Sequence, residues 1–293
     1  ATTRFTALVT GQIHYFGEGS NSLLPGQVQQ INRDFADRVV LDPTYHTWGK
    51  GAIFNSSREP YDDVRVRRAV NIGLDRDEWI EFKAISDTES LAILSAFMPP
   101  GSQWAFTEEE LREWPGMRQP KQQDIDLANS LLDEVFGAGQ RFSTSCMTSN
   151  RQMYVDGCLF FKDQMEKHYD ITVAMDINEA AVNTAKGNAG DFDMTYGSAL
   201  ASYTGDPDSW YSYNIPYDTL ATSRVHAVGD PQREQNPVLY QALQDMVAAQ
   251  SREMDVEKRI EMVKEIEWKL YDEAAYYIPY GWTIIYPGYS PDL

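Results

Sequence analysis

The feature that most constrains the fold is an alternation of helix-like and strand-like segments from residue 124 onward. In order, the patterns predict a helix at 124–136 ended by Gly137, a strand at 141–147, a helix at 154–168, a strand at 171–175, a helix at 178–186 and a strand at 192–196. Strands separated by helices in this way indicate βαβ units and an α/β sheet. Two further helices at 237–250 and 255–271 and a strand at 276–286 are expected near the end of the chain.

A second informative segment spans residues 54–76. Pro60 biases Glu59 away from helix, and Asp62 or Asp63 is expected to cap the helix that follows. Asp75 is expected to restart a second helix. The apolar residues between these caps fall at helical spacing and predict one buried stripe; they are Val66, Ala69, Val70 and Leu74.

Three arginines in this segment have two interpretations. Arg65, Arg67 and Arg68 could pair with the aspartates before them and with nearby carbonyl groups, or could contact a ligand. Arginine suits both roles because its planar guanidinium makes fork-shaped hydrogen bonds. The structural role is the favoured interpretation.

The same segment resembles the signature of the family 5 extracellular solute-binding proteins, the receptors that capture peptides or oligosaccharides for ABC importers. The resemblance is carried by Asn55 and by the run Pro60-Tyr61-Asp62-Asp63-Val64-Arg65-Val66-Arg67-Arg68-Ala69-Val70-Asn71, ending in Asp75-Arg76. Shorter matches follow at Leu127–Glu134, Gly190–Met194, Gly205–Asp208, Lys258–Leu270 and Ala274–Pro279. Each of these shorter motifs is weak alone, but together they extend the resemblance over most of the chain.

The resemblance implies an α/β fold of the periplasmic-binding-protein type 2 kind, with the second lobe nearly complete and parts of the first lobe. Against the usual length of the family, the chain corresponds to a C-terminal portion. The expected division is a partial first lobe and interlobe crossing at 1–55, a second lobe at 56–273 and a strand returning toward the first lobe at 274–293.

The function implied by the resemblance is capture of an extracytoplasmic solute by closure of two lobes, followed by delivery to a permease. The expected partners are the solute and an ABC transporter permease, with no nucleic acid, and the protein is expected to be a monomer. No cofactor, metal or catalytic residue is expected. The implied location is periplasmic or extracellular, with or without a lipid anchor on the outer face of the cytoplasmic membrane.

The candidate binding residues gather in two stretches. Residues 195–217 are rich in aromatic side chains and turn residues, which suit sugars or extended peptides. A second stretch precedes Asn55, on the presumed interlobe crossing. The predicted ligand contacts are Tyr196, Ser202, Tyr203, Thr204 and Trp210 in the first stretch and Tyr45, His46 and Trp48 in the second.

One departure from the family pattern bears on the ligand. Peptide-binding relatives carry an Asp three residues before the Asp-Pro turn, where it pairs with the α-amino group of the peptide, and the matching position here is Tyr203. A neutral phenol does not balance an ammonium as a carboxylate does. We therefore expect an uncharged ligand such as an oligosaccharide, or an N-blocked or unusual peptide.

Two other functions remain as alternatives. Asp206 and Asp208 resemble a pair of glycosidase carboxylates, although Asp-Pro-Asp is also common in turns. A hydrolase is therefore the least favoured reading. The other alternative is a ligand-sensing module of a regulator, because binding folds are reused in many contexts.

Charge and cysteine usage limit the remaining classes. The formal net charge of −19 argues against nucleic acid as a partner, because phosphates would be repelled. Cys146 and Cys158 are the only two cysteines. They lie in a predicted strand and the following helix, so either a disulfide or two buried thiols fit, and two thiols are favoured. The four histidines are scattered and have no metal-ligand spacing.

Overall fold

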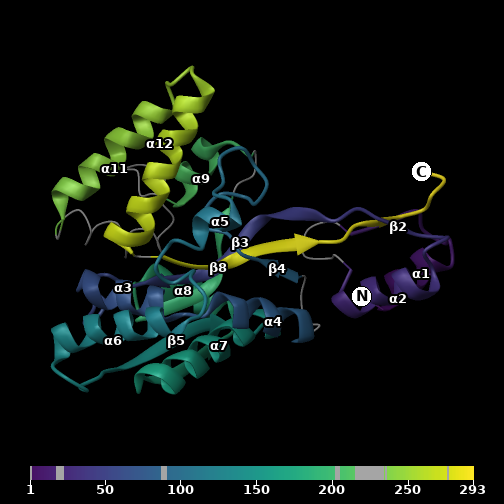
Figure 1. The fold of residues 1–293 in the computed structure, drawn as a ribbon. Helices are drawn as coiled ribbons and strands as arrows, with labels where there is room; N and C mark the ends of the chain where they lie inside the picture. Colours follow the sequence, from purple (N-terminus) through teal and green to yellow (C-terminus); the bar gives the residue numbers. More distant parts are fainter. Residues whose placement is uncertain are drawn as a thin grey trace.

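The computed structural model describes residues 2–17, 23–86, 91–201, 205–214, 234, 236–275 and 277–293. Figure 1 shows a large body and, at the far end of two long strands, a small unit that holds both chain termini. The two strands are β3 (Thr44–Phe54) and β8 (Tyr277–Ile285), which pair antiparallel with each other. No helix in the described ranges is long and apolar enough to cross a membrane.

A six-stranded mixed sheet forms the centre of the body, in the order β4-β8-β3-β7-β5-β6. Its parallel part joins β5 to β6 and to β7, and its antiparallel part joins β3 to β7 and to β8 and β4 to β8. The remaining strands are β4 (Leu91–Ile93), β5 (Ser143–Ser149), β6 (Thr172–Asn178) and β7 (Met194–Ala201). The predicted α/β sheet is therefore confirmed.

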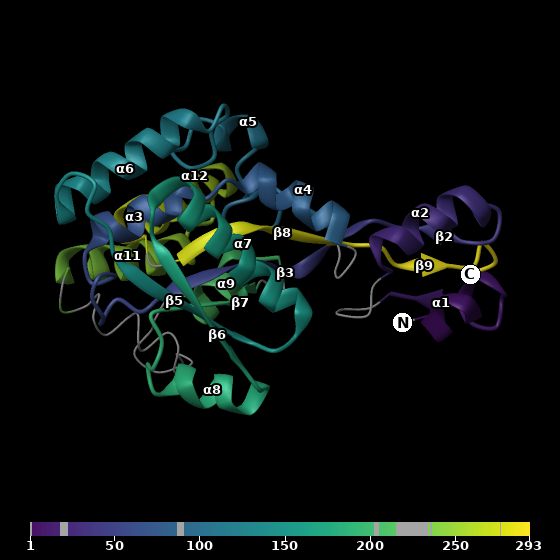
Figure 2. The ribbon, with the colours of Figure 1, turned by 90° about the horizontal axis from the view of Figure 1, so that it is seen from below.

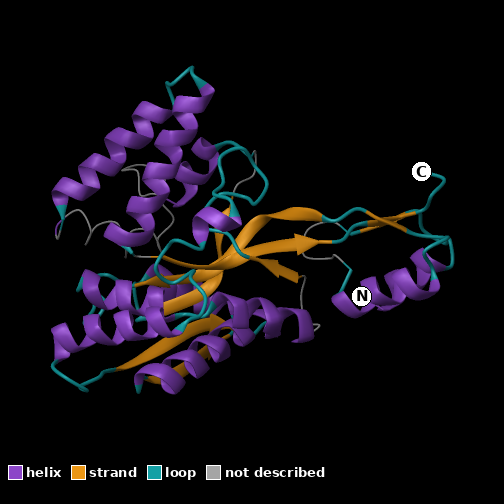
Figure 3. Ribbon diagram, in the orientation of Figure 1, coloured by secondary structure: helices purple, strands orange, loops and turns teal. Residues whose placement is uncertain are grey.

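Helices cover both faces of this sheet (Figure 3). Below it in Figure 1 lie α3, α4, α6 and α7, and above it lie α5, α9, α11 and α12. The bounds are α3 (Val64–Gly73), α4 (Arg76–Ser86), α5 (Glu108–Leu111), α6 (Gln122–Phe136), α7 (Gln152–Tyr169), α8 (Ala180–Asn188), α9 (Pro207–Asn214), α11 (Pro237–Gln250), α12 (Val256–Trp268) and η2 (Lys269–Ala274). All of the helices expected between 124 and 271 are present, with ends shifted by a few residues.

Two hydrophobic cores result, one on each side of the sheet. The α3-side core contains Phe54, Ile278 and Tyr280 together with residues of α3, α6 and α7. The α12-side core contains Tyr277 and Trp282 together with residues of α9, α11, α12 and the 94–117 segment. The 94–117 segment has little regular structure apart from α5, yet it is closely packed, with Trp104 and Trp114 both buried.

A bulge in β8 allows one strand to serve both cores. Lys50 pairs with Gly281 and Gly51 with Pro279, which leaves Tyr280 as an extra residue. The extra residue reverses the alternation of side chains, so Tyr280 faces the α3-side core and Trp282 the α12-side core. Gly281 has φ +153°, and a Cβ there would lie 2.7 Å from the carbonyl oxygen of Ile93, so only glycine fits.

The signature segment forms α3 and α4 as predicted. The side chain of Asp63 accepts a hydrogen bond from the backbone N–H of Arg65 and caps α3, and Asp75 accepts from the N–H groups of Asp77 and Glu78 at the start of α4. Asn55 donates to the carbonyls of Gly190 and Phe192. These two hydrogen bonds hold the end of β3 in place against the residues that lead into β7.

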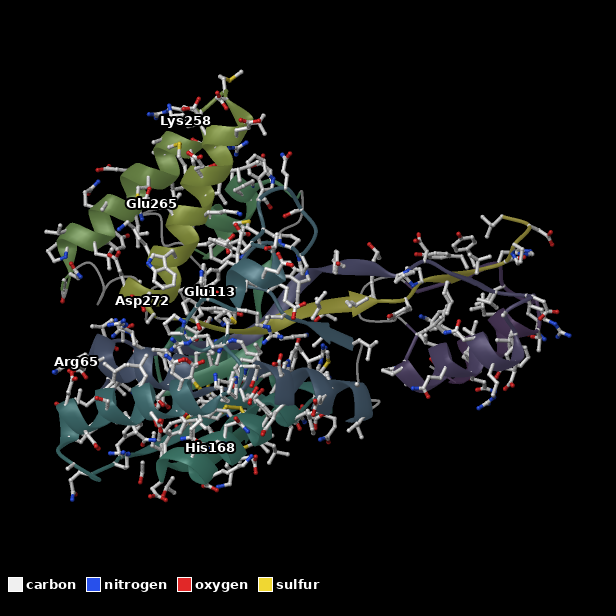
Figure 4. The ribbon with its side chains drawn as sticks, viewed as in Figure 1. Arg65, Glu113, His168, Lys258, Glu265 and Asp272 are labelled. Carbon is white, nitrogen blue, oxygen red and sulfur yellow. A yellow bond between two sulfur atoms is a disulfide. The ribbon has the colours of Figure 1, made fainter. Side chains whose placement is uncertain are left out.

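The structural interpretation of the three arginines is confirmed. Arg67 is buried and donates to the carbonyl oxygens of Tyr61, Asp62 and Ala274. Arg65 pairs with Asp63. Arg68 pairs not with the nearby aspartates but with Asp272, which lies in η2 beside α3 (Figure 4).

The small unit has a third, separate core. Its sheet has the order β1-β9-β2, with all pairs antiparallel. Its elements are α1 (Thr2–Val9), β1 (Tyr15–Phe16), α2 (Pro25–Asp34), β2 (Val40–Leu41) and β9 (Gly288–Tyr289). The core residues include Leu8, Leu23, Ile31 and Val39. Figure 2, seen from below, shows this unit standing clear of the body.

The two cysteines form a disulfide, so the favoured expectation of two free thiols is wrong. Cys146 in β5 and Cys158 in α7 are 5.7 Å apart between Cα atoms, within the usual range for a bridge. Both are fully buried in the α3-side core. The sequence could not decide this because the pairing depends on how α7 packs on β5.

Candidate functional site

The structure brings together the two stretches in which ligand contacts are predicted. Trp48 in β3 pairs with Ala201, the last residue of β7. Ala201 directly precedes Ser202 in the sequence, so the described end of β7 reaches the second stretch at Trp48. Ser202, Tyr203 and Thr204 lie outside the described residues, and the side chains of His46 and Trp48 are also not described. We call the backbone of residues 45–48 and Ala201 the β3–β7 junction.

Tyr45 is a predicted contact whose side chain is described and lies outside the two cores, and it is 41% exposed. It pairs with Ile284 of β8 on the stretch that leads to the small unit. Its ring lies near Gly101, where a Cβ would be 3.3 Å from Tyr45 Cε2. A half-exposed tyrosine at this position can offer both an apolar face and a hydroxyl group to a ligand.

Tyr196 lies in the α3-side core and is almost fully buried. Its ring centroid is 4.9 Å from that of Tyr280 and 6.0 Å from that of Trp79. Gly157 in α7 makes room for this ring, because a Cβ there would lie 2.1 Å from Tyr196 Cε1. The side chain therefore has almost no surface to offer a ligand, and it joins β7 to α7.

Trp210 lies in the other core, on the α12 side, and is also buried. It packs against Phe97, with centroids 5.2 Å apart, and against Tyr211 at 5.5 Å. Tyr196 and Trp210 thus belong to different clusters and are not brought together. Aromatic residues in a turn-rich stretch gave the same sequence signal whether they face a ligand or a core.

The Asp206–Asp208 turn is held by a network of ion pairs and hydrogen bonds from α11 and α12. Asp206 accepts hydrogen bonds from Arg259 Nη2 at 2.9 Å and Nη1 at 3.1 Å. It also accepts from the backbone N–H of Asp208 at 2.9 Å, and so caps α9. Gln250 donates to Asp208 through its side-chain amide.

The pKa of Asp206 argues against a role as a general acid. Burial alone would raise the pKa of this carboxyl, but the hydrogen bonds from Arg259 and from the Asp208 amide outweigh burial and hold it below its ordinary value. A glycosidase general acid needs the opposite, a carboxyl with a raised pKa that keeps its proton near neutral pH. Asp206 is suited to be a structural anion.

Sequence reasoning missed the partners of this turn. Arg259 and Gln250 lie in helices that begin and end far along the chain from Asp206, and no local motif links them. The only sequence signal was the Asp-Pro turn itself. Among the described residues, no group of three or more His, Cys, Asp or Glu side chains could hold a metal ion.

An open groove of about 490 Å³ lies elsewhere, on the surface of α6. It is lined by Asp126, Asn129, Ser130, Asp133, Glu134 and Ala138. It shares no residue with the β3–β7 junction or the Asp206 turn. Asp133 is already engaged there by Arg141, so the groove gives no sign of a ligand site.

Comparisons with known proteins bear on the fold and the family. The sequence profile of the family described as "Bacterial extracellular solute-binding proteins, family 5 Middle" matches residues 1–221. The periplasmic oligopeptide-binding protein OppA of Escherichia coli (strain K12) is 22% identical over 207 residues, which make up 70% of this chain and 36% of that protein.

Solved structures are similar over nearly the whole chain. The murein tripeptide binding protein MppA of Escherichia coli matches with a TM-score of 0.71 and 18% identity, covering 99% of this chain and 52% of that one. OppA of Haemophilus influenzae, in complex with RPPGFSPFR, matches with a TM-score of 0.68 and 17% identity, covering 99% and 52%. The chain therefore spans about half the length of these solved relatives.

Proposed function

Because the chain belongs to the bacterial extracellular solute-binding proteins of family 5, we propose that it is part of the solute-binding component of an ABC importer and captures a peptide-like solute. Capture is a shift between open and closed arrangements of two lobes and involves no chemistry on the solute. The closed form then docks on the permease. We propose a monomer that acts as a binding protein and not as an enzyme.

The observation that carries this proposal is the β3–β7 junction. It lies where β3 leaves the body toward the small unit, and Trp48 pairs there with the last residue of β7. We propose that residues 1–55 and 274–293 belong to the first lobe and the crossing, and residues 56–273 to the second lobe. The separate core of the small unit supports this division.

We propose that the solute contacts the side chains around this junction. The proposed contacts are Tyr45, His46 and Trp48 from β3 and Ser202, Tyr203 and Thr204 after β7. Tyr196 and Trp210 are buried in the two cores on opposite sides of the sheet, which supports a packing role rather than contact with the solute. Ligand affinity in such sites comes from aromatic faces with a few polar groups.

A peptide is better supported as the solute than an oligosaccharide. OppA of Haemophilus influenzae is in complex with a peptide, and MppA is a murein tripeptide binding protein. Neither of these relatives is described as binding an oligosaccharide. The expectation of an uncharged solute depended on Tyr203 alone, which lies outside the described residues.

The buried disulfide supports a location outside the cytoplasm. Structural disulfides persist in oxidising compartments such as the periplasm and are rare where thiols are kept reduced. Cys146 and Cys158 form such a bridge in the α3-side core. We therefore propose a periplasmic or extracellular protein, either free or lipid-anchored.

A thermal-shift screen of the full-length protein tests this function. The ligands would be the murein tripeptide, RPPGFSPFR and maltotriose, each at increasing concentration. A ligand that binds only the folded state adds about 2.7 kcal/mol of stability at a hundredfold excess over its dissociation constant. A rise in melting temperature with a peptide supports the proposal, and a rise with maltotriose alone contradicts the peptide assignment.

A further inference from the structure

The turn that begins α9 is held by residues from two other helices. Arg259 lies in α12, and both of its terminal nitrogens donate hydrogen bonds to Asp206. Its Nε donates to Gln250 Oε1 at 3.0 Å. Gln250, at the end of α11, is fully buried and donates in turn to Asp208 and to the Val247 carbonyl. Each of the three guanidinium nitrogens thereby donates a hydrogen bond.

The guanidinium is also covered by an aromatic ring. Its central carbon lies 4.8 Å from the ring centroid of Trp104, which belongs to the packed 94–117 segment. The side chain of Arg259 is only 16% exposed. A cation held between a carboxylate and an aromatic face, and shielded from water, has little freedom to move.

The position of this turn links it to the β3–β7 junction. Ala201 is fixed by its pairing with Trp48, and Asp206, five positions later in the sequence, is fixed by Arg259. Pro207 then begins α9, which places Trp210 against Phe97. Ala201 is thus held by strand pairing and Asp206 by Arg259, and α9 packs against β7.

We propose that Arg259 is a positioning residue for solute binding: it orders the start of α9 next to the β3–β7 junction without contacting the solute. This inference rests on the function proposed above. Binding to a site that is already ordered avoids the entropy cost of ordering it on association, so loss of the anchor weakens affinity even when every contacting side chain is kept. Lysine is a poor replacement, because one ammonium cannot supply the fork that reaches both Asp206 and Gln250.

The chain offers a matched control on the same helix. Lys264 pairs with Glu110 at 2.6 Å and lies 4.9 Å from the ring centroid of Phe106. Lys264→Gln therefore deletes a cation of α12 that contacts both a carboxylate and an aromatic ring, and Arg259→Gln deletes a cation with the same two kinds of contact. Only Arg259 contacts the turn that begins α9, so a general loss of α12 packing would affect both variants alike.

The experiment compares wild type, Arg259→Gln, Arg259→Lys and Lys264→Gln in the full-length protein, at a temperature where circular dichroism shows all four folded. The first measurement is hydrogen exchange of the amides of Asp208 and Ser209, which bond to the side chain and the carbonyl of Asp206. The second is calorimetric affinity for the murein tripeptide and for RPPGFSPFR.

We expect Arg259→Gln to speed exchange at these two amides at least tenfold and to weaken peptide binding at least tenfold. Arg259→Lys should fall between, and Lys264→Gln should match wild type in both measurements. Equal affinity of Arg259→Gln and Lys264→Gln, or unchanged exchange in Arg259→Gln, would overturn the inference. If wild type binds neither peptide, the peptide assignment fails, and the exchange measurement still decides whether Arg259 orders the turn.

Discussion

Glu267 provides a sharp test of the packing between α12 and the 94–117 segment. Its side chain is fully buried in the body, and its Oε2 accepts a hydrogen bond from the backbone N–H of Phe97 at 3.1 Å. Among the residues that the structure describes, its Oε1 finds no hydrogen-bond partner. Burial raises the pKa of this carboxyl from 4.5 to about 8, against smaller opposing effects of the Phe97 and Met98 N–H groups and of Lys264. The folded protein therefore carries Glu267 protonated at neutral pH.

The consequence for stability has a definite sign. Between pH 4.5 and about 8 the folded protein keeps a proton that the unfolded chain has released, so the free energy of unfolding falls as the pH rises through this window. One pKa unit corresponds to about 1.4 kcal/mol, so Glu267 lowers the free energy of unfolding by about 3 kcal/mol between pH 4.5 and pH 7. Glu267→Gln removes this cost, because the amide is neutral and its oxygen can still accept from Phe97.

Urea unfolding followed by tryptophan fluorescence measures the effect. Glu267→Gln should match wild type near pH 4.5, exceed its free energy of unfolding by about 3 kcal/mol at pH 7, and gain little more above pH 8. Glu265→Gln is the control, since Glu265 is exposed on the same helix and points away from the core (Figure 4). If the difference between Glu267→Gln and wild type does not change with pH, Glu267 is not held protonated and the reasoning is refuted.

Two further predictions concern the α3-side core. Replacing both Cys146 and Cys158 by alanine should lower the free energy of unfolding by about 3 kcal/mol, because the bridge closes a short loop of the chain. Urea unfolding of the wild type with and without reductant measures the same contribution, and equal stabilities would show that the bridge does not form. Gly157→Ala should cost about 1–3 kcal/mol because the new Cβ meets the ring of Tyr196. Gly197→Ala, with nothing within 4 Å of its Cβ, is the matched control in a thermal melt, and equal losses in the two variants would rule out the predicted clash.

Local features of the fold could be predicted from the sequence because their causes are local. The caps at Asp63 and Asp75 act on N–H groups two or three residues away, and the strand and helix periods from residue 124 onward need no distant partner. The family signature could also be read, since Asn55 and Arg67 have fixed structural roles.

Features that depend on distant packing could not be predicted. The bridge between Cys146 and Cys158 requires α7 to lie on β5, and the anchor between Asp206 and Arg259 joins segments that have no common motif. Aromatic content alone did not separate Tyr45, which is half exposed, from Tyr196 and Trp210, which fill two cores. The β8 bulge at Tyr280, which lets one strand serve both cores, also left no sequence pattern.

The most direct test of the central claim is native mass spectrometry of the full-length protein. The protein, freed of bound solute by unfolding and refolding, would be mixed with a random library of short peptides and an equal amount of maltooligosaccharides. The proposed function predicts complexes that contain one peptide per protein molecule. Complexes with oligosaccharide alone, or no complex with either class, would contradict it.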